Sequence, residues 1–134
     1  MLLALAEPQH PHHAAAQSAF LGCVKDGWAS CPLTQNGFLR ITAQPTYVHA
    51  RPLSAAVSLL GLWTARSEHE FWPDDLSLLD GGAIDHARLL SQRHLTDVYL
   101  LALALKHGGR MVTLDRSVPR AAVRGATAEH LWVV

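Results

Sequence analysis

A long apolar segment that leads through two glycines into a short apolar one constrains the fold more than any other feature of this sequence. Residues 96–107 have the length and spacing of a buried helix, and Thr96 is predicted to cap its start. The glycine pair at residues 108–109 favours the left-handed conformation in which helices commonly end. Residues 111–114 have the composition of a short buried strand that ends at Asp115. A helix that returns directly into a strand is typical of an α/β fold, whose parallel strands need such connections.

The other predicted elements continue this alternation of helices with strands. Apolar residues recur at helical spacing in residues 11–25 and 53–66. A further helix is predicted to begin at Thr34 or Asn36. Short strands are predicted at residues 29–33 and 130–134, and a further one within residues 71–79, after a turn at residues 73–75. A chain of 134 residues, 49% of them hydrophobic, is long enough for one core, so we expect a single α/β domain over residues 1–134 with a mainly parallel sheet flanked by helices.

Composition excludes several classes of protein. No apolar stretch approaches the ~20 residues that span a bilayer, so no membrane helix is predicted. Residues 1–6 are apolar, but no basic residue precedes them and no small-residue cleavage site follows, so a secretory signal is not expected. Cys23 and Cys31 are too few for a disulfide framework and are predicted to be reduced packing residues. We therefore expect a cytoplasmic protein.

Charge is balanced overall but unevenly distributed. Residues 1–85 contain four Lys and Arg against eight Asp and Glu, whereas residues 86–134 contain seven against three. A basic final third of this kind can approach a polyanion, because local charge matters more for such binding than net charge. A solvated surface explains the same distribution equally well.

Asp97 and Asp115 are the candidate functional residues, because α/β folds place functional groups beyond the carboxyl ends of their strands. Asp115 follows the strand at residues 111–114, and Asp97 lies in the first turn of the helix that leads into it. Both carboxylates are therefore expected at one edge of the sheet, where they would repel each other unless a cation or a proton neutralised them. Mg²⁺ or Mn²⁺ would bind there through oxygen ligands and activate water for phosphodiester hydrolysis.

Structural roles explain the same two residues without any chemistry. An Asp near a helix start often stabilises the helix dipole, and an Asp followed by Arg after a strand, here Asp115 and Arg116, often forms a turn or an ion pair. In that case the chain would be some other small α/β enzyme.

Two further groups of residues are weaker candidates. His10, His12 and His13 lack the spacing of a helical zinc pair and are expected at the surface. The four tryptophans are too scattered for a base-stacking platform, so we expect them to pack in the core. The sequence also has no phosphate-binding loop, nucleophile elbow or dinucleotide fingerprint.

Three segments together resemble the PIN-domain ribonucleases of the VapC toxin type. They are residues 31–40 (CPLTQNGFLR), 95–104 (LTDVYLLALA) and 108–115 (GGRMVTLD), and the similarity extends over nearly the whole chain. The second and third segments carry the Thr-Asp before a helix and the strand-ending Asp that are typical of this family. The resemblance makes Asp97 the strongest single candidate and Asp115 the next.

This resemblance implies a PIN-like three-layer sandwich and a Mg²⁺- or Mn²⁺-dependent endoribonuclease, the toxin of a type II toxin–antitoxin system. RNA, often transfer RNA, is the implied substrate, and a homodimer silenced by a VapB-like antitoxin is the implied assembly. Thr96 would support the site through its hydroxyl, and Arg116 would contact phosphate, although capping and surface roles explain both residues equally well.

The sequence departs from the family pattern in two places. Family members open with a strand that ends in Asp and leads into a helix resembling residues 1–6, so the chain is expected to start just after that first metal ligand and to lack the first strand. Many members also have a catalytic Glu within residues 34–40, where this chain has Gln35, Asn36 and Gly37. Gln35 or Asn36 would contact RNA or a metal-bound water, or Asn36 would simply cap the helix.

These departures support an alternative function. With two of the four acids left, the affinity for a cation is expected to fall considerably. The alternative is a PIN-fold protein impaired in catalysis that still binds an antitoxin and takes part in regulation.

Overall fold

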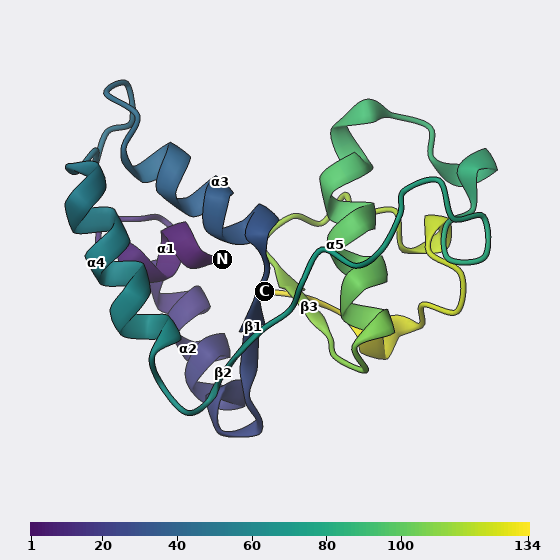
Figure 1. Ribbon diagram of the computed structural model, residues 1–134, viewed down its shortest axis with the longest axis horizontal. Coiled ribbons are helices and arrows are strands. Elements are labelled where there is room, and N and C mark those ends of the chain that lie inside the picture. Colours follow the sequence, from purple (N-terminus) through teal and green to yellow (C-terminus); the bar gives the residue numbers. More distant parts are fainter. The chain divides into compact units, whose positions relative to one another are not determined.

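The computed structural model describes residues 1–134 and divides by its internal contacts into two compact units. We call Met1–Asp74 the N-terminal unit and Asp75–Val134 the C-terminal unit (Figure 1). Each unit combines helices with one two-stranded parallel sheet. The predicted α/β class with parallel strands is confirmed, and these features are consistent with a PIN-like fold. A single domain over residues 1–134, and the layering of its elements, stay predictions.

The N-terminal unit consists mainly of helices, with one strand pair. Its elements are α1 (Leu2–Ala6), α2 (His13–Cys23), η1 (Val24–Asp26), β1 (Trp28–Ser30), α3 (Pro32–Thr42), α4 (Leu53–Thr64) and β2 (His69–Phe71). In the parallel pair, Trp28 lies opposite His69 and Ser30 lies opposite Phe71. Strand β1 therefore ends directly before α3, and its carboxyl end is next to the first turn of that helix.

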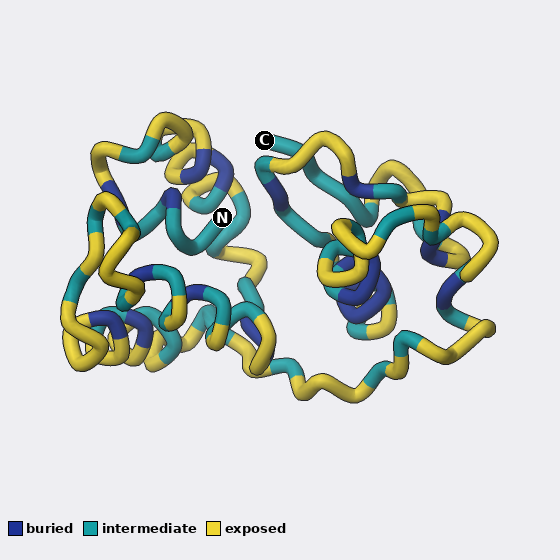
Figure 2. The backbone as a smooth tube through the Cα atoms, turned by 90° about the horizontal axis from the view of Figure 1, so that it is seen from above, coloured by how far each residue is buried: buried dark blue, intermediate teal, exposed yellow.

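The short strand predicted after the turn at residues 73–75 is wrong in its position, because β2 lies before that turn and ends at Phe71. Pro73 follows almost at once and has no N–H group to donate to a sheet. The apolar residues that suggested the strand have another role, since Leu76 and Leu78 pack against the core of the C-terminal unit. Leu79 is 86% exposed, and the segment after β2 is largely exposed as well (Figure 2).

The start of α3 also differs from the prediction that Thr34 or Asn36 caps it. The N-cap is Cys31, whose main-chain N–H donates to Thr34 Oγ1 at 2.9 Å, so Thr34 is the third residue of the helix. Pro32 occupies the first helical position, where its fixed φ angle favours the helix and its missing N–H costs nothing. Pro32 therefore ends β1 earlier and begins the helix earlier than apolar spacing indicates.

The C-terminal unit is built around one long helix and a strand pair. Its elements are η2 (His86–Arg88), η3 (Gln92–His94), α5 (Leu95–Lys106), β3 (Met111–Thr113), η4 (Arg120–Ala122), η5 (Ala128–His130) and β4 (Leu131–Val133). Met111 lies opposite Leu131, and Thr113 lies opposite Val133. Gly108 has a φ of 68° and ends α5 in the left-handed conformation that the sequence predicts.

Thr96 does not cap α5, contrary to the prediction. The N-cap is His94, because the single turn η3 runs directly into the helix. The side chain that accepts a main-chain hydrogen bond in this region is that of Ser91, from the Arg93 N–H. Thr96 is therefore the second residue of α5, and its side chain is exposed.

The tryptophans lie at the margins of the cores, and none of the four is fully buried. Trp63 packs against Phe38 in the N-terminal unit, and the Arg110 guanidinium lies 4.7 Å from the Trp132 ring in the C-terminal unit. Core packing is therefore only partly the role of these residues. Cys23 and Cys31 are free, as predicted, and no helix is long and apolar enough to cross a membrane.

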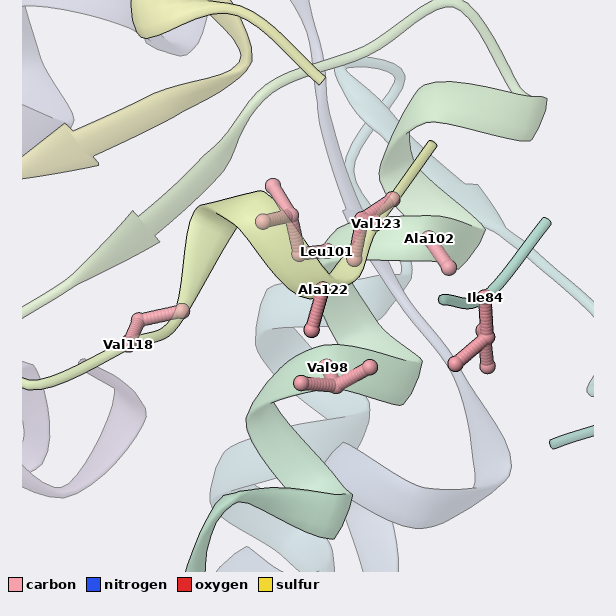
Figure 3. Packing of buried hydrophobic residues seen from close by; sticks show 7 residues of the cluster. All are labelled: Ile84, Val98, Leu101, Ala102, Val118, Ala122 and Val123. Carbon is pink, nitrogen blue, oxygen red and sulfur yellow. The ribbon is translucent and has the colours of Figure 1, made fainter. Parts of the chain in front are cut away.

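The core of the C-terminal unit forms on one face of α5. Figure 3 shows the seven buried side chains of this cluster, which are Ile84, Val98, Leu101, Ala102, Val118, Ala122 and Val123. Because Val98 directly follows Asp97, packing of this face determines where the first turn of α5 lies. The core therefore positions a candidate functional residue.

Replacing Leu101 with Ala is expected to destabilise the C-terminal unit by about 2–5 kcal/mol, because Leu101 is fully buried and its loss leaves a cavity. Denaturant unfolding followed by circular dichroism measures the change. Leu79→Ala, at an exposed position of the same unit, is the matched control and should cost far less. Equal losses in the two variants would contradict this account of the core.

Candidate active site

Asp97 is the third residue of α5, and it is half-buried. The residues that follow it, Val98 and Tyr99, are buried, so the backbone that carries the carboxylate is held by the core. Burial raises the pKa of Asp97 above its usual value, and the nearby Asp115 carboxylate raises it further, while His94 acts in the opposite direction. The folded protein therefore disfavours the ionised form of this residue.

Asp115 lies in the turn after β3 and is exposed. Its Oδ1 accepts hydrogen bonds from the main-chain N–H and the hydroxyl of Ser117, both at 2.7 Å. Its own N–H donates to Thr113 Oγ1 at 3.0 Å. The hydrogen bonds from Ser117 lower the pKa of Asp115, so this carboxylate stays ionised. Its Oδ2 accepts no hydrogen bond and is available to a ligand.

Two carboxylates of the C-terminal unit thus lie close enough for one to change the pKa of the other. They come from the start of α5 and the end of β3, the two places that the sequence singles out. No group of three or more His, Cys, Asp or Glu side chains is arranged to hold a metal. Mg²⁺ commonly binds through only one or two carboxylates and keeps several waters, so the pair fits an open site for a hard divalent cation.

The other predicted site residues have no fixed role in this structure. Thr96 and Arg116 are next in sequence to the two carboxylates, and both side chains are exposed without a hydrogen bond or ion pair. Asn36 is exposed on α3 in the N-terminal unit, and its side chain has no partner either. Their proposed roles stay predictions.

Two residues near the carboxylates were not predicted from the sequence. His94 is the N-cap residue of α5, and its imidazole lowers the pKa of both Asp97 and Asp115. Ser117 orients Asp115 through two hydrogen bonds. An Asp with Ser two positions later is a known turn pattern, so Ser117 had a detectable signal. His94 had none, because only the η3 turn brings it to the helix start.

The purely structural roles considered for Asp97 and Asp115 explain Asp115 in part and do not explain Asp97. Asp115 does form a turn with Ser117, as an Asp after a strand often does, but it makes no ion pair with Arg116. A purely stabilising Asp at a helix start would have a lowered pKa, because the helix dipole favours the charged form. The pKa of Asp97 is raised instead. An ionisable side chain whose charged form is disfavoured in the folded protein is typical of functional sites.

Comparison with known proteins identifies relatives along nearly the full chain. Ribonuclease VapC44 of Mycobacterium tuberculosis is 46% identical over 131 residues, covering 98% of this chain and 92% of the relative. Ribonuclease VapC39 of the same organism is 39% identical over 126 residues, covering 93% and 91%. Ribonuclease VapC38 is 38% identical over 118 residues, covering 87% and 82%.

No model of a known protein family matches the chain, and no solved structure matches it. The similarity to the relatives nevertheless covers 98% of the chain for Ribonuclease VapC44 and 93% for Ribonuclease VapC39, and so extends across both units. The chain therefore belongs to the family of VapC ribonucleases.

Proposed function

We propose that this chain is the toxin of a type II toxin–antitoxin system and that it cleaves RNA as an endoribonuclease with Mg²⁺ or Mn²⁺ bound by Asp97 and Asp115. The observation that carries the proposal is the pair of carboxylates at the start of α5 and the end of β3, which lie close enough for the Asp115 charge to raise the pKa of Asp97. Membership of the VapC family supports the reaction type.

The donor set fits a hard divalent cation. Burial and the nearby Asp115 carboxylate both disfavour the ionised form of Asp97, and a bound cation would offset both effects. Asp115 supplies a free Oδ2 while Ser117 holds its Oδ1. When bound, such a cation lowers the pKa of water and stabilises charge on the phosphate. The role of the two side chains is to bind the cation and fix its position.

Neighbouring residues are suited to binding and orienting RNA. Arg116 follows Asp115 directly and has a free guanidinium, which suits a phosphate oxygen. Thr96 precedes Asp97 and offers a free hydroxyl at the exposed side of the first turn of α5. These contacts would orient the scissile bond, while the carboxylates would hold a cation, whose chemistry when bound would be the activation of water.

The proposal includes partners and location. We expect a VapB-like antitoxin to silence the toxin, a homodimer to be the assembled form, and the cytoplasm, where RNA is present, to be the compartment. Transfer RNA is the substrate class that we favour, because this is the common target implied by the family resemblance.

A second function is favoured by a specific observation. The carboxylates form a pair and no larger cluster, which gives a cation fewer protein ligands than a site with three or four acids. A chain that binds the cation too weakly for turnover would still present its surface to an antitoxin. Its function would then be binding and regulation.

Replacing Asp97 with Asn should abolish Mg²⁺-dependent cleavage of a mixed RNA pool, because the amide keeps the shape but supplies no charge to the cation. The loss is expected to be at least about 100-fold, the scale typical of an essential catalytic group. Gel analysis with and without EDTA measures it.

Glu129→Gln is the matched control, because Glu129 is an exposed acid of the same unit whose carboxylate makes no contact. Its rate should equal that of the unaltered chain. If Asp97→Asn cleaves RNA as fast as this control, the assignment of Asp97 is wrong. If a folded chain with the natural sequence cleaves nothing while it retains a VapB-like protein, the second function holds.

Asp97→Asn should also raise the melting temperature at pH 7 in EDTA, whereas Asp115→Asn should lower it. The pKa of Asp97 is raised by folding, so its ionisation costs stability above the usual pKa of about 3.9 and this cost disappears as the pH falls through that value. The pKa of Asp115 is lowered by folding, so the opposite holds. Differential scanning fluorimetry between pH 2 and pH 8 gives both trends, because the stabilisation by Asp115 is lost only below its usual pKa of about 3.9.

Mg²⁺ should stabilise the unaltered chain and neither variant, because a ligand stabilises the state that binds it. A stabilisation by Mg²⁺ that survives both substitutions would place the cation elsewhere.

A further inference from the structure

A series of two partly buried hydrogen bonds joins three side chains of the N-terminal unit. Ser30 Oγ lies 2.8 Å from His69 Nε2, and Gln35 Nε2 donates to the same Ser30 Oγ at 3.0 Å. Ser30 is only 3% exposed, and its main-chain oxygen accepts from the Trp72 N–H at 3.0 Å, so its position is fixed by the strand pair β1 and β2. This series therefore links the sheet to the first turns of α3.

The direction of these hydrogen bonds follows from the state of His69. Burial lowers the pKa of His69, so the imidazole is neutral and carries one N–H. In the neutral tautomer that carries its proton on Nδ1, the Nε2 atom that faces Ser30 has a free lone pair. Nε2 is then an acceptor and takes the hydroxyl proton of Ser30.

Ser30 has one hydrogen, which is now assigned, so its oxygen can only accept from Gln35. The NH₂ group of Gln35 must therefore face Ser30, and its Oε1 must face away. Oε1 has no hydrogen-bond partner in the structure, and Gln35 is partly exposed. The hydrogen bonds from His69 through Ser30 thus hold the Gln35 amide in one of its two orientations and leave its carbonyl oxygen without a partner.

The place of this oxygen in the unit indicates its use. Gln35 lies in the first turns of α3, which directly follows the carboxyl end of β1, where α/β proteins bind ligands. A neutral acceptor has no attraction for phosphate oxygens, which are themselves acceptors. The donor that every nucleotide of RNA presents, and that DNA lacks, is the ribose 2′-hydroxyl.

We propose that Ser30 and His69 are positioning residues that orient Gln35, so that Gln35 Oε1 accepts a hydrogen bond from a ribose 2′-hydroxyl and selects RNA over DNA. This inference rests on the proposed function for its substrate class. It assigns a specificity role to Gln35 that is separate from the carboxylates of the C-terminal unit.

The test compares variants by the affinity for one single-stranded RNA and for the DNA of the same sequence, measured by fluorescence anisotropy in EDTA. Ser30→Ala removes the hydroxyl that links His69 to Gln35. His69→Phe keeps a ring beside Trp28 but removes the nitrogen that accepts the hydrogen bond from Ser30. Each should reduce the preference for RNA by about fivefold, the value of one neutral hydrogen bond, as should Gln35→Ala. His69→Gln supplies a carbonyl acceptor and should restore the preference.

A spectroscopic measurement separates positioning from simple packing. Exchange of the Gln35 side-chain amide protons with water, followed by NMR, should be faster by about tenfold in Ser30→Ala and His69→Phe than in the natural sequence or in His69→Gln, because an intact hydrogen bond protects them. Unchanged exchange in both broken variants would overturn the positioning role. Two variants are used, so that failure of one to fold leaves the other as the measurement.

Failure of this inference is distinguishable from failure of the proposed function. Binding in EDTA requires no cleavage, so an inactive chain can still show the preference for RNA. Altered amide exchange with an unchanged ratio of RNA to DNA affinity would overturn the contact with the 2′-hydroxyl. A chain that cleaves RNA in Mg²⁺ and shows that same unchanged ratio would retain the proposed function without this specificity role.

Discussion

The buried face of α5 is the constraint on which the candidate active site depends. Val98, Leu101 and Ala102 pack into the core of the C-terminal unit, and this packing holds Asp97 in the first turn of the helix. Gly108 then returns the chain into β3, so that Asp115 emerges at the end of that strand. Two acidic groups are thereby held near each other, although burial and the Asp115 charge both raise the pKa of Asp97. Packing of the buried face of α5 thus holds Asp97 and Asp115 close together, an arrangement that a bound cation would stabilise.

The two carboxylates have different environments, and this difference suits a joint role. Asp115 is exposed and accepts two hydrogen bonds from Ser117, which lower its pKa. Its carboxylate is therefore already ionised when a cation binds. Asp97 is half-buried and gains more from a cation, because burial and Asp115 both disfavour its charge. In the N-terminal unit, the hydrogen bonds from His69 through Ser30 to Gln35 likewise leave one oxygen, Gln35 Oε1, without a hydrogen-bond partner.

Much of the fold could be predicted where local pattern and tertiary packing agree. The apolar length of α5, the glycine at its end and the short strand β3 are all readable from residues 95–113, and the topology of a helix followed by a strand predicted the approach of Asp97 to Asp115. The strand β2 was misplaced because Leu76 and Leu78 serve the core of the C-terminal unit and not a sheet. The helix starts were misplaced because Pro32 and the η3 turn begin the helices earlier.

Contacts between distant residues could not be predicted in this way. Ser30 and His69 are 39 positions apart, and nothing in either segment alone indicates that they meet. His94 reaches the carboxylates only because a single turn of helix precedes α5. Patterns within a segment report burial and periodicity, whereas these contacts arise from the register of strands and the direction of turns.

The most direct test of the central claim is an NMR titration of the unaltered chain with Mn²⁺, which broadens signals of nuclei close to the ion. The account predicts that broadening is centred on residues 94–98 and 113–117 and that it disappears in Asp97→Asn. Broadening centred elsewhere, or broadening around these residues that persists in Asp97→Asn, would contradict the claim that Asp97 and Asp115 together form the cation site.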